Sequence, residues 1–315
     1  MIQADVLFAL RAAALASRIV RECFSTSGCA AEAKSDGTPV SETDLRIEDE
    51  LRAMVRRERP ADAFLGEERG ESAGEGSAPA PHLRRWVVDP IDGTKSLVRG
   101  VPLFGSLIGL QVDGVNALGV ASFPAIGSGG SMGQTYIGGA GVADGCLLLR
   151  GELPPNLDSA SFSKLMQRAE RCRVSKRVVL AGATVCVTDP RAMLVNNRGW
   201  LEHLSLALGP TGVLRSWGDC YGHAMVASGR ADVMIDSPMK IWDVAAIEPL
   251  IRSAGGVIAD WNGDAPGDGS RGVISAASGE LLARVIESGH EEKQRNSNEE
   301  KQQSSNAAKQ QMGGG

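Results

Sequence analysis

The residues best able to carry chemistry lie in Asp89-Pro90-Ile91-Asp92-Gly93-Thr94, which follows the apolar residues 86–88. The apolar stretch predicts a strand that ends at Asp89, and ligands of α/β proteins commonly bind at such strand ends. The proline and glycine of the segment favour a sharp turn that brings Asp92 beside Asp89. Two close carboxylates repel each other, and a hard dication such as Mg²⁺ relieves the repulsion. Taken alone, the segment is equally compatible with a β-turn carrying two solvated acids.

The end of this segment offers a second chemical group. If a helix begins at Gly93-Thr94, its free N–H groups form an anion site directly beside the acids. The Thr94 hydroxyl would also cap that helix, which is the ordinary role of a threonine there. Both roles can hold at once.

Three further acids stand at the ends of expected elements. Glu67 follows a short apolar strand at 63–65, and Asp243 and Asp44 each stand at the start of an expected helix. Considered singly, a loop acid is usually solvated and an acid before a helix is usually a cap. It is their order along the chain, together with the Asp89 segment, that points to a shared site.

This combination resembles the inositol monophosphatase superfamily of metal-dependent phosphatases, from about residue 5 to 288. The matching motifs are Gly66-Glu67-Glu68, the segment 89–94, and Trp242-Asp243-Val244-Ala245-Ala246 followed by Ala254-Gly255-Gly256. The resemblance implies a layered α/β fold, an αβαβα sandwich, and assembly as a homodimer.

The resemblance also implies a set of metal ligands. Glu67, Asp89 and the carbonyl oxygen of Ile91 would hold one Mg²⁺. Asp89, Asp92 and Asp243 would hold a second, in a centre of two or three ions. The substrate implied is a small phosphate monoester.

Catalytic roles follow from the same resemblance. Thr94, paired with Asp44, would polarise the attacking water beside Glu67, while the Gly93 and Thr94 amides bind the phosphate. Water would attack phosphorus in line as the metal charge neutralises the departing alkoxide, without a covalent phosphoenzyme. The sequence lacks the residues of two other phosphatase mechanisms. It has no cysteine followed by arginine six positions later, as a cysteine phosphatase requires, and no Arg-His-Gly, as a phosphohistidine mechanism requires.

The finer pattern resembles the histidinol-phosphate phosphatases, in the segments 92–102, 215–222 and 231–236. Histidinol phosphate carries an ammonium group and an imidazole, and acids at Asp219 and Asp236 would pair with that charge. Without such a role, Asp219 is a turn residue and Asp236 a strand-end acid. We therefore predict hydrolysis of L-histidinol phosphate, a step of histidine biosynthesis.

Several alternatives stay open at this point. Arg99 would shape the substrate pocket or a dimer contact, but a solvated loop arginine is equally compatible. Leu97 replaces the aromatic residue usual in the family. Lys95, in Asp-Gly-Thr-Lys, is similar to the motif of the 3′-phosphoadenosine-5′-phosphate phosphatases, so a nucleotide substrate stays open. Inositol 1-phosphate is a third candidate substrate. A non-catalytic relative that binds a metabolite is a different class, although such proteins usually lose a metal ligand and all are present here.

Composition sets the remaining expectations. The chain has 315 residues and a net charge of −5, so nucleic acid is not an expected partner. No apolar stretch reaches the roughly 20 residues of a membrane span, and the six cysteines show no C-x-x-C pair. We therefore expect reduced, mostly buried thiols in a cytoplasmic protein.

The elements that must position these residues can be outlined. Periodicity predicts a helix over 3–24, and Asp113-Gly114 predicts a hairpin between strands at 104–112 and 115–123. The glycine-rich stretch 127–145 has no clear assignment. Alternating strands and helices then continue to the end of the globular part.

We expect an N-terminal half at 1–150 with most metal ligands and a C-terminal half at 151–288 that completes the site. The polar tail at 289–315 has no apolar periodicity and is expected to be disordered.

Overall fold

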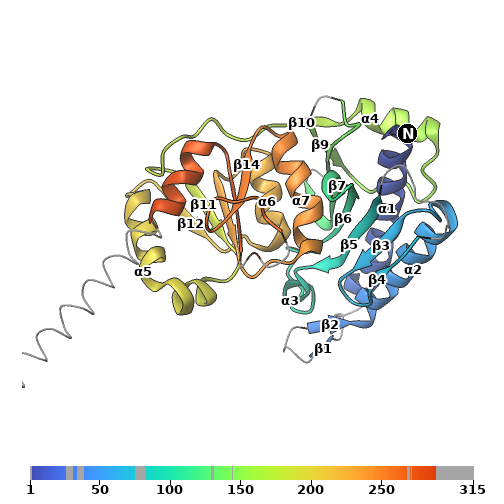
Figure 1. The fold of residues 1–315 in the computed structure, drawn as a ribbon, viewed down its shortest axis with the longest axis horizontal. Helices are drawn as coiled ribbons and strands as arrows, with labels where there is room; N and C mark the ends of the chain where they lie inside the picture. Colours follow the sequence, from blue (N-terminus) through green and yellow to red (C-terminus); the bar gives the residue numbers. More distant parts are fainter. Residues whose placement is uncertain are drawn as a thin grey trace, which may run out of the picture.

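A computed structural model describes residues 2–25, 31–33, 39–74, 83–128, 131–143, 145–267, 270 and 272–288. Two sheets alternate with three layers of helices (Figure 1). The expected αβαβα sandwich is therefore confirmed. The predicted tail at 289–315 lies outside the described residues.

The first sheet has eight strands in the order β10-β9-β8-β7-β6-β5-β3-β4. Its strands are β3 (Ala63–Gly66), β4 (Gly70–Ser72), β5 (Arg84–Asp92), β6 (Gly105–Val112), β7 (Val115–Ser128), β8 (Ser131–Gly139), β9 (Cys146–Arg150) and β10 (Glu170–Cys172). All neighbours are antiparallel except β3 and β5, which run parallel. Helix α4 (Ser159–Gln167) connects β9 to β10.

One face of this sheet is covered by α1 (Ile2–Ser25) and α2 (Glu42–Glu58), with the short hairpin of β1 (Ala31–Ala33) and β2 (Pro39–Ser41) between them in sequence. Both helices bury apolar side chains at helical spacing, as Leu10 in α1 and Leu51 in α2 illustrate. At the start of α2 the Asp44 carboxylate accepts a hydrogen bond from the Ser41 amide at 2.9 Å, which closes a capping box.

The second sheet has five strands in the order β12-β11-β13-β15-β14. They are β11 (Thr184–Val187), β12 (Val213–Arg215), β13 (Val233–Asp236), β14 (Val257–Asp260) and β15 (Val273–Ala276). Helices α6 (Asp219–Ala227) and α7 (Ile241–Ser253) lie between the two sheets, and their side chains form a shared core with both. Helix α5 (Pro190–Leu208) and a helix over 279–288 pack on the outer face.

Several sequence expectations can be compared directly with these elements. The hairpin at Asp113-Gly114 is confirmed, and both residues have positive φ, 52° and 79°, as a tight hairpin turn requires. The glycine-rich stretch contains β8, because pairing with strands on both sides outweighs the weak strand preference of glycine. The last strand of the first sheet is β10, which ends at Cys172 and pairs with β9, and the second sheet begins with β11 at Thr184.

The cysteines bear out the expectation only in part. Among the described residues Cys146, Cys172, Cys186 and Cys220 are free and buried. Cys23 is disulfide-bonded, so the prediction of reduced thiols is wrong for that residue. Across the part of the chain that is described, no helix has the length and apolar character needed to cross a membrane.

Helix α7 approaches the first sheet unusually closely because glycines face it. A Cβ on Gly119 would lie 1.9 Å from the carbonyl oxygen of Ala246, and a Cβ on Gly109 would lie 2.8 Å from Ala245. Only a residue without a side chain fits at such positions. This contact fixes the first turn of α7, which carries Asp243, against the sheet that carries the other acids.

We predict that Gly119→Ala lowers the free energy of unfolding by about 1–3 kcal/mol, because the added methyl group forces α7 away from the sheet. Urea unfolding would measure the loss. Gly279→Ala is the matched control, since a Cβ there meets nothing within 4 Å. Equal stability of the two variants would contradict a tight contact between α7 and the sheet.

Candidate metal centre

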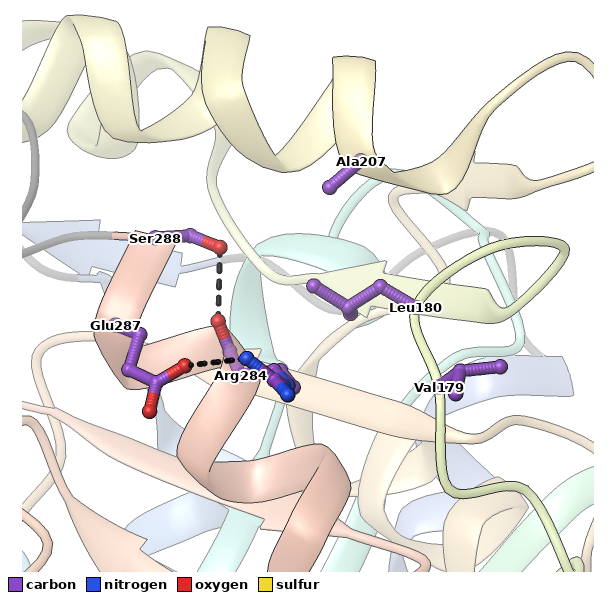
Figure 2. A pocket seen from close by; sticks show the side chains of 6 residues that line it. All are labelled: Val179, Leu180, Ala207, Arg284, Glu287 and Ser288. Atoms are coloured by element: carbon purple, nitrogen blue, oxygen red, sulfur yellow. Dashed lines mark hydrogen bonds and ion pairs between the residues drawn. The ribbon is translucent and has the colours of Figure 1, made fainter.

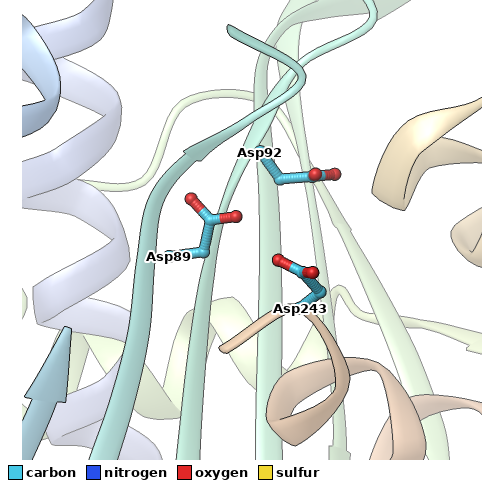
Figure 3. Close-up of side chains that lie close together, drawn as sticks. All are labelled: Asp89, Asp92 and Asp243. Carbon is cyan, nitrogen blue, oxygen red and sulfur yellow. The ribbon is translucent and has the colours of Figure 1, made fainter. Parts of the chain in front are cut away.

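Three carboxylates converge where β5 meets the start of α7. The ligand atoms of Asp89, Asp92 and Asp243 all lie within 4.8 Å of one another. Figure 3 shows the three side chains close together, two from β5 and one from the first turn of α7. Asp89 and Asp243 thus meet at one site although they are about 150 residues apart in the sequence. The oxygens form a donor set that suits a hard divalent cation.

A bulge in β5 puts both of its aspartates on one side. Asp89 pairs with Leu107 and Asp92 with Gly105, so β5 has one residue more than β6 between these pairs. In a regular strand, residues three apart point to opposite faces, and the extra residue reverses that relation. Pro90 favours the bulge because it has no backbone N–H to donate to the neighbouring strand. Its carbonyl accepts a hydrogen bond from the Ser106 hydroxyl at 2.6 Å.

Crowding of like charges is the main electrostatic feature of the site. Burial raises the pKa of Asp89 well above its usual value, and the neighbouring charge of Glu67 raises it further. Burial also raises the pKa of Asp243, and it raises that of Asp92 to about 6 with a further contribution from Asp236. The buried Oδ1 of Asp89 has no hydrogen-bond partner. A bound cation would both neutralise the repulsion and occupy this oxygen, so the residues fit a metal ion.

Glu67 lies beside this cluster, at the turn after β3. Strand β3 runs parallel to β5 with Gly66 opposite Val88, and the Glu67 amide donates to the Val88 carbonyl at 3.2 Å. Because Gly66 lies opposite Val88, the residues that follow them, Glu67 and Asp89, are neighbours. The charge of Glu67 raises the pKa of Asp89 and also contributes to the raised pKa of Asp44, for which burial is the largest cause.

The hydroxyl of Thr94 has a different partner from the one expected. It donates to the Ile91 carbonyl at 2.9 Å, whereas the Asp44 carboxylate accepts from the amide and hydroxyl of Ser41. The proposed pairing of Thr94 with Asp44 is therefore replaced by two local contacts. The Ile91 carbonyl retains a second lone pair, so its expected role as a metal ligand is still compatible with this arrangement.

The expected helix start after the acidic turn is present but short. Helix α3 (Thr94–Leu97) has Gly93 as its N-cap, with φ of 83°. A Cβ on Gly93 would lie 2.7 Å from the Leu103 carbonyl, so both its conformation and its surroundings require glycine. The Gly93 and Thr94 amides therefore stand at the beginning of α3, next to Asp92.

Residues of α6 and β13 extend the acidic region away from β5. Burial raises the pKa of Asp219 to about 8, with further contributions from the charges of Asp92 and Asp236. Asp219 is one of the two described non-glycine residues with positive φ, at 51°, an uncommon conformation for such a residue. The structure thus brings both predicted substrate acids close enough to Asp92 for their charges to interact.

Two residues of this region were not found from the sequence. The Cys220 amide donates to Asp92 Oδ2, which anchors the start of α6 to the cluster. His223 is buried, with Nδ1 2.7 Å from Ser275 Oγ and Nε2 3.7 Å from Asp236 Oδ2. A main-chain donor leaves no mark in a sequence, and a lone histidine in a helix is usually a packed core residue.

Two other features lie apart from the cluster. Arg99 is exposed, and its guanidinium donates to the Lys95 carbonyl at 2.9 Å, so its described contact is local. Figure 2 shows a shallow hollow of about 260 Å³ on the outer face of the second sheet, between α5 and the helix over 279–288. Its charged lining residues Arg284 and Glu287 pair with each other, and the hollow holds none of the clustered carboxylates.

The sandwich and its buried carboxylates define a layered α/β protein with a centre able to bind a hard cation. The model of the inositol monophosphatase family matches residues 3–294. The chain belongs to the inositol monophosphatase family, and it is a phosphoric monoester hydrolase.

Individual relatives show how far the likeness extends. A histidinol-phosphatase of Chlorobaculum parvum is 32% identical over 292 residues, covering 92% of this chain and 99% of the relative. An inositol-1-monophosphatase of Mesorhizobium japonicum is 30% identical and covers 80% of this chain and 83% of the relative. The structure of an inositol monophosphatase from Zymomonas mobilis superposes with a TM-score of 0.70 at 24% identity, covering 91% of this chain and 98% of that one.

We predict that the metal-free protein becomes less stable as pH rises from about 5 to 8. In that window Asp92 and Asp219, with pKa values of about 6 and 8, hold protons more tightly in the folded state than in the unfolded state. The stability they contribute is complete below the unfolded pKa of about 4 and is lost as pH passes through the folded values.

Urea unfolding in EDTA at pH 5 and pH 8 would measure this loss, which we expect to be about 1 kcal/mol or more. Asp219→Asn should show a weaker dependence on pH, because it removes the group with the higher pKa. A variant whose stability changes with pH as much as that of the wild type would rule out Asp219 as a source.

Proposed function

We propose that this phosphatase hydrolyses L-histidinol phosphate to L-histidinol and phosphate, as in histidine biosynthesis, with Mg²⁺ as its cofactor. The observation that carries the proposal is the position of Asp219 and Asp236 beside Asp92. Burial and the charge of Asp92 disfavour ionisation of Asp219, so a cationic group bound there would relieve the same repulsion. Histidinol phosphate supplies an ammonium and an imidazole on the molecule that carries the phosphate.

The metal ligands are assigned by their positions in the cluster. Asp89, Asp92 and Asp243 would hold Mg²⁺ directly, and Glu67 and the Ile91 carbonyl would complete a centre of two or three ions. When bound, the ions would supply positive charge to the phosphoryl oxygens and make a neighbouring water more acidic.

The remaining residues would bind and orient the reactants. The Gly93 and Thr94 amides would donate to the phosphate, holding phosphorus in line with the attacking water. The carboxylates of Glu67 and Asp44 would accept the proton that this water loses. Thr94 would orient the water once its hydroxyl turns from the Ile91 carbonyl. Water adds to phosphorus as the ester oxygen leaves, and the departing alkoxide takes up a proton to give the alcohol.

A second substrate is supported by one of the comparisons. The relative from Mesorhizobium japonicum is named an inositol-1-monophosphatase and is nearly as similar as the histidinol-phosphatase. Inositol phosphate is a neutral polyol apart from its phosphate, so its hydroxyls can donate hydrogen bonds to these carboxylates but bring no positive charge to pair with them. The acids therefore favour histidinol phosphate over inositol phosphate. 3′-Phosphoadenosine-5′-phosphate is a third substrate to be compared.

The homodimer and the cytoplasmic location stay predictions, and Arg99 stays a proposed pocket or dimer residue.

Phosphate release with and without Mg²⁺ is the direct test of the proposed reaction. The panel should contain histidinol phosphate, inositol 1-phosphate, 3′-phosphoadenosine-5′-phosphate and fructose 1,6-bisphosphate. We expect Mg²⁺-dependent release, with the highest kcat/KM for histidinol phosphate. Preference for another compound would overturn the substrate, and no release from any compound would favour a non-catalytic relative.

We predict that Asp92→Asn and Asp243→Asn each lower kcat/KM by at least about 100-fold, since even partners outside the first ligand shell commonly cost 10–100-fold. The reason is the loss of a charged oxygen from the shared site. Asp264→Asn, at an exposed position, is the control and should behave as wild type. Near-normal rates of the two cluster variants at saturating Mg²⁺ would remove both residues from the metal centre.

We predict that Asp236→Asn raises KM for histidinol phosphate by about tenfold or more, because it removes a charge-assisted hydrogen bond to the amine or the imidazole. The KM for inositol 1-phosphate should change much less. Steady-state kinetics on both substrates would measure the difference. The same increase for both would show that Asp236 does not recognise the cationic part of the substrate.

A further inference from the structure

Glu48 is a buried carboxylate that the proposed reaction does not use. It lies on α2 one turn after Asp44, and it is 0% exposed. Buried glutamates are rare unless they are paired, so the position needs an explanation. Arg52, one further turn along, donates to Glu48 Oε1 at 2.7 Å and provides the opposite charge.

The two oxygens of Glu48 bind the main chain of the turn that carries Glu67. The amide of Glu68 donates to Oε2 at 2.7 Å, and the amide of Arg69 donates to Oε1 at 3.0 Å. On the other side, the Glu67 amide donates to the Val88 carbonyl at 3.2 Å. The backbone around Glu67 is therefore held both by α2 and by β5, while its side chain lies beside Asp89.

The glycine of the Gly66-Glu67-Glu68 motif is what lets Glu48 come so close. A Cβ on Gly66 would lie 2.2 Å from the Glu48 carboxyl carbon, which is shorter than any tolerable contact. Arg52 secures the far end of the same turn, since it also donates to the Gly70 carbonyl and the Ser72 hydroxyl, both at 2.8 Å. Glu48 and Arg52, on one face of α2, thus hold the turn at four positions, 68, 69, 70 and 72.

We propose that Glu48 is a positioning residue that sets the metal affinity of the site by holding the turn of Glu67. The inference rests on the proposed role of Glu67 as a metal ligand. A carboxylate is required because both of its oxygens accept. In a glutamine one oxygen becomes an NH₂ donor, which would face one of the two main-chain amides and leave that amide unpaired.

The test measures Mg²⁺ binding to the metal-free protein by isothermal titration calorimetry, together with phosphate release as a function of Mg²⁺. Glu48→Gln should weaken Mg²⁺ binding by about 10–100-fold, as the loss of outer partners commonly does. The kcat at saturating Mg²⁺ should stay within a few-fold of wild type, because the ligands themselves are unchanged. Unchanged Mg²⁺ affinity in Glu48→Gln, with Glu67→Gln weakened, would overturn the proposal.

The control is the neighbouring acid on the same helix. Asp49 is half exposed and binds the side chain of Arg69 rather than the main chain of the turn. Asp49→Asn removes the same charge from the same helix, so it should leave Mg²⁺ affinity unchanged. An equal loss in Asp49→Asn would show that general charge, and not the main-chain contacts, sets the affinity, and it would overturn the proposal.

A double-variant cycle separates positioning from a purely structural role. If Glu48 acts through Glu67, then Glu48→Gln should have little further effect on Mg²⁺ affinity in a Glu67→Gln protein. A full additional loss in that background would overturn the proposal. Unchanged affinity in Glu67→Gln alone would instead remove Glu67 from the proposed centre, which is a failure of the proposed function.

A shorter acid covers the case in which Glu48→Gln does not fold. Glu48→Asp keeps two accepting oxygens but withdraws them by one methylene group. It should bind Mg²⁺ with an affinity between those of the wild type and Glu67→Gln. Affinity equal to that of the wild type would mean that the contact with the turn does not matter.

Discussion

Repulsion between buried carboxylates is the constraint on which the rest of this structure depends. The ligand atoms of Asp89, Asp92 and Asp243 lie within 4.8 Å of one another. Asp89 is buried and the other two are half-buried, and burial and like charge both disfavour ionisation. Such a cluster does not arise from chain collapse, which would separate the acids or expose them. It persists because independent parts of the fold hold each acid in place, and because a cation would turn the repulsion into attraction.

In each of those parts a feature of the backbone lets the acid reach its place. The bulge at Pro90 turns two aspartates of one strand to the same side. The glycines under α7 let its first turn reach the sheet, and Gly66 lets Glu48 reach the turn of Glu67. The geometry of the site therefore depends on glycines, which have no side chain, and on a proline, which has no backbone N–H.

The sandwich was predicted from the resemblance to the inositol monophosphatase superfamily, and the grouping of acids from their places at the ends of expected elements. The motif at 89–94 and the acids Glu67 and Asp243 stand at element ends, and their order is specific. The partner of Thr94 could not be predicted, since a sequence does not fix the side-chain rotamer that directs its hydroxyl to the Ile91 carbonyl. Strand β8 was not predicted because its glycines have a weak strand preference. The contact of the Cys220 amide could not be predicted either, since every residue except proline has such a donor.

The contact between Cys220 and Asp92 has an evolutionary consequence. It joins the start of helix α6 to the carboxylate cluster. The Cys220 thiol also hydrogen-bonds Asp92, and the second donor is the main-chain amide. Every amino acid except proline supplies that donor. The main-chain bond to Asp92 therefore persists when side chains at the start of α6 are substituted, so such changes can alter the surroundings of Asp92 without detaching the helix from the carboxylate cluster.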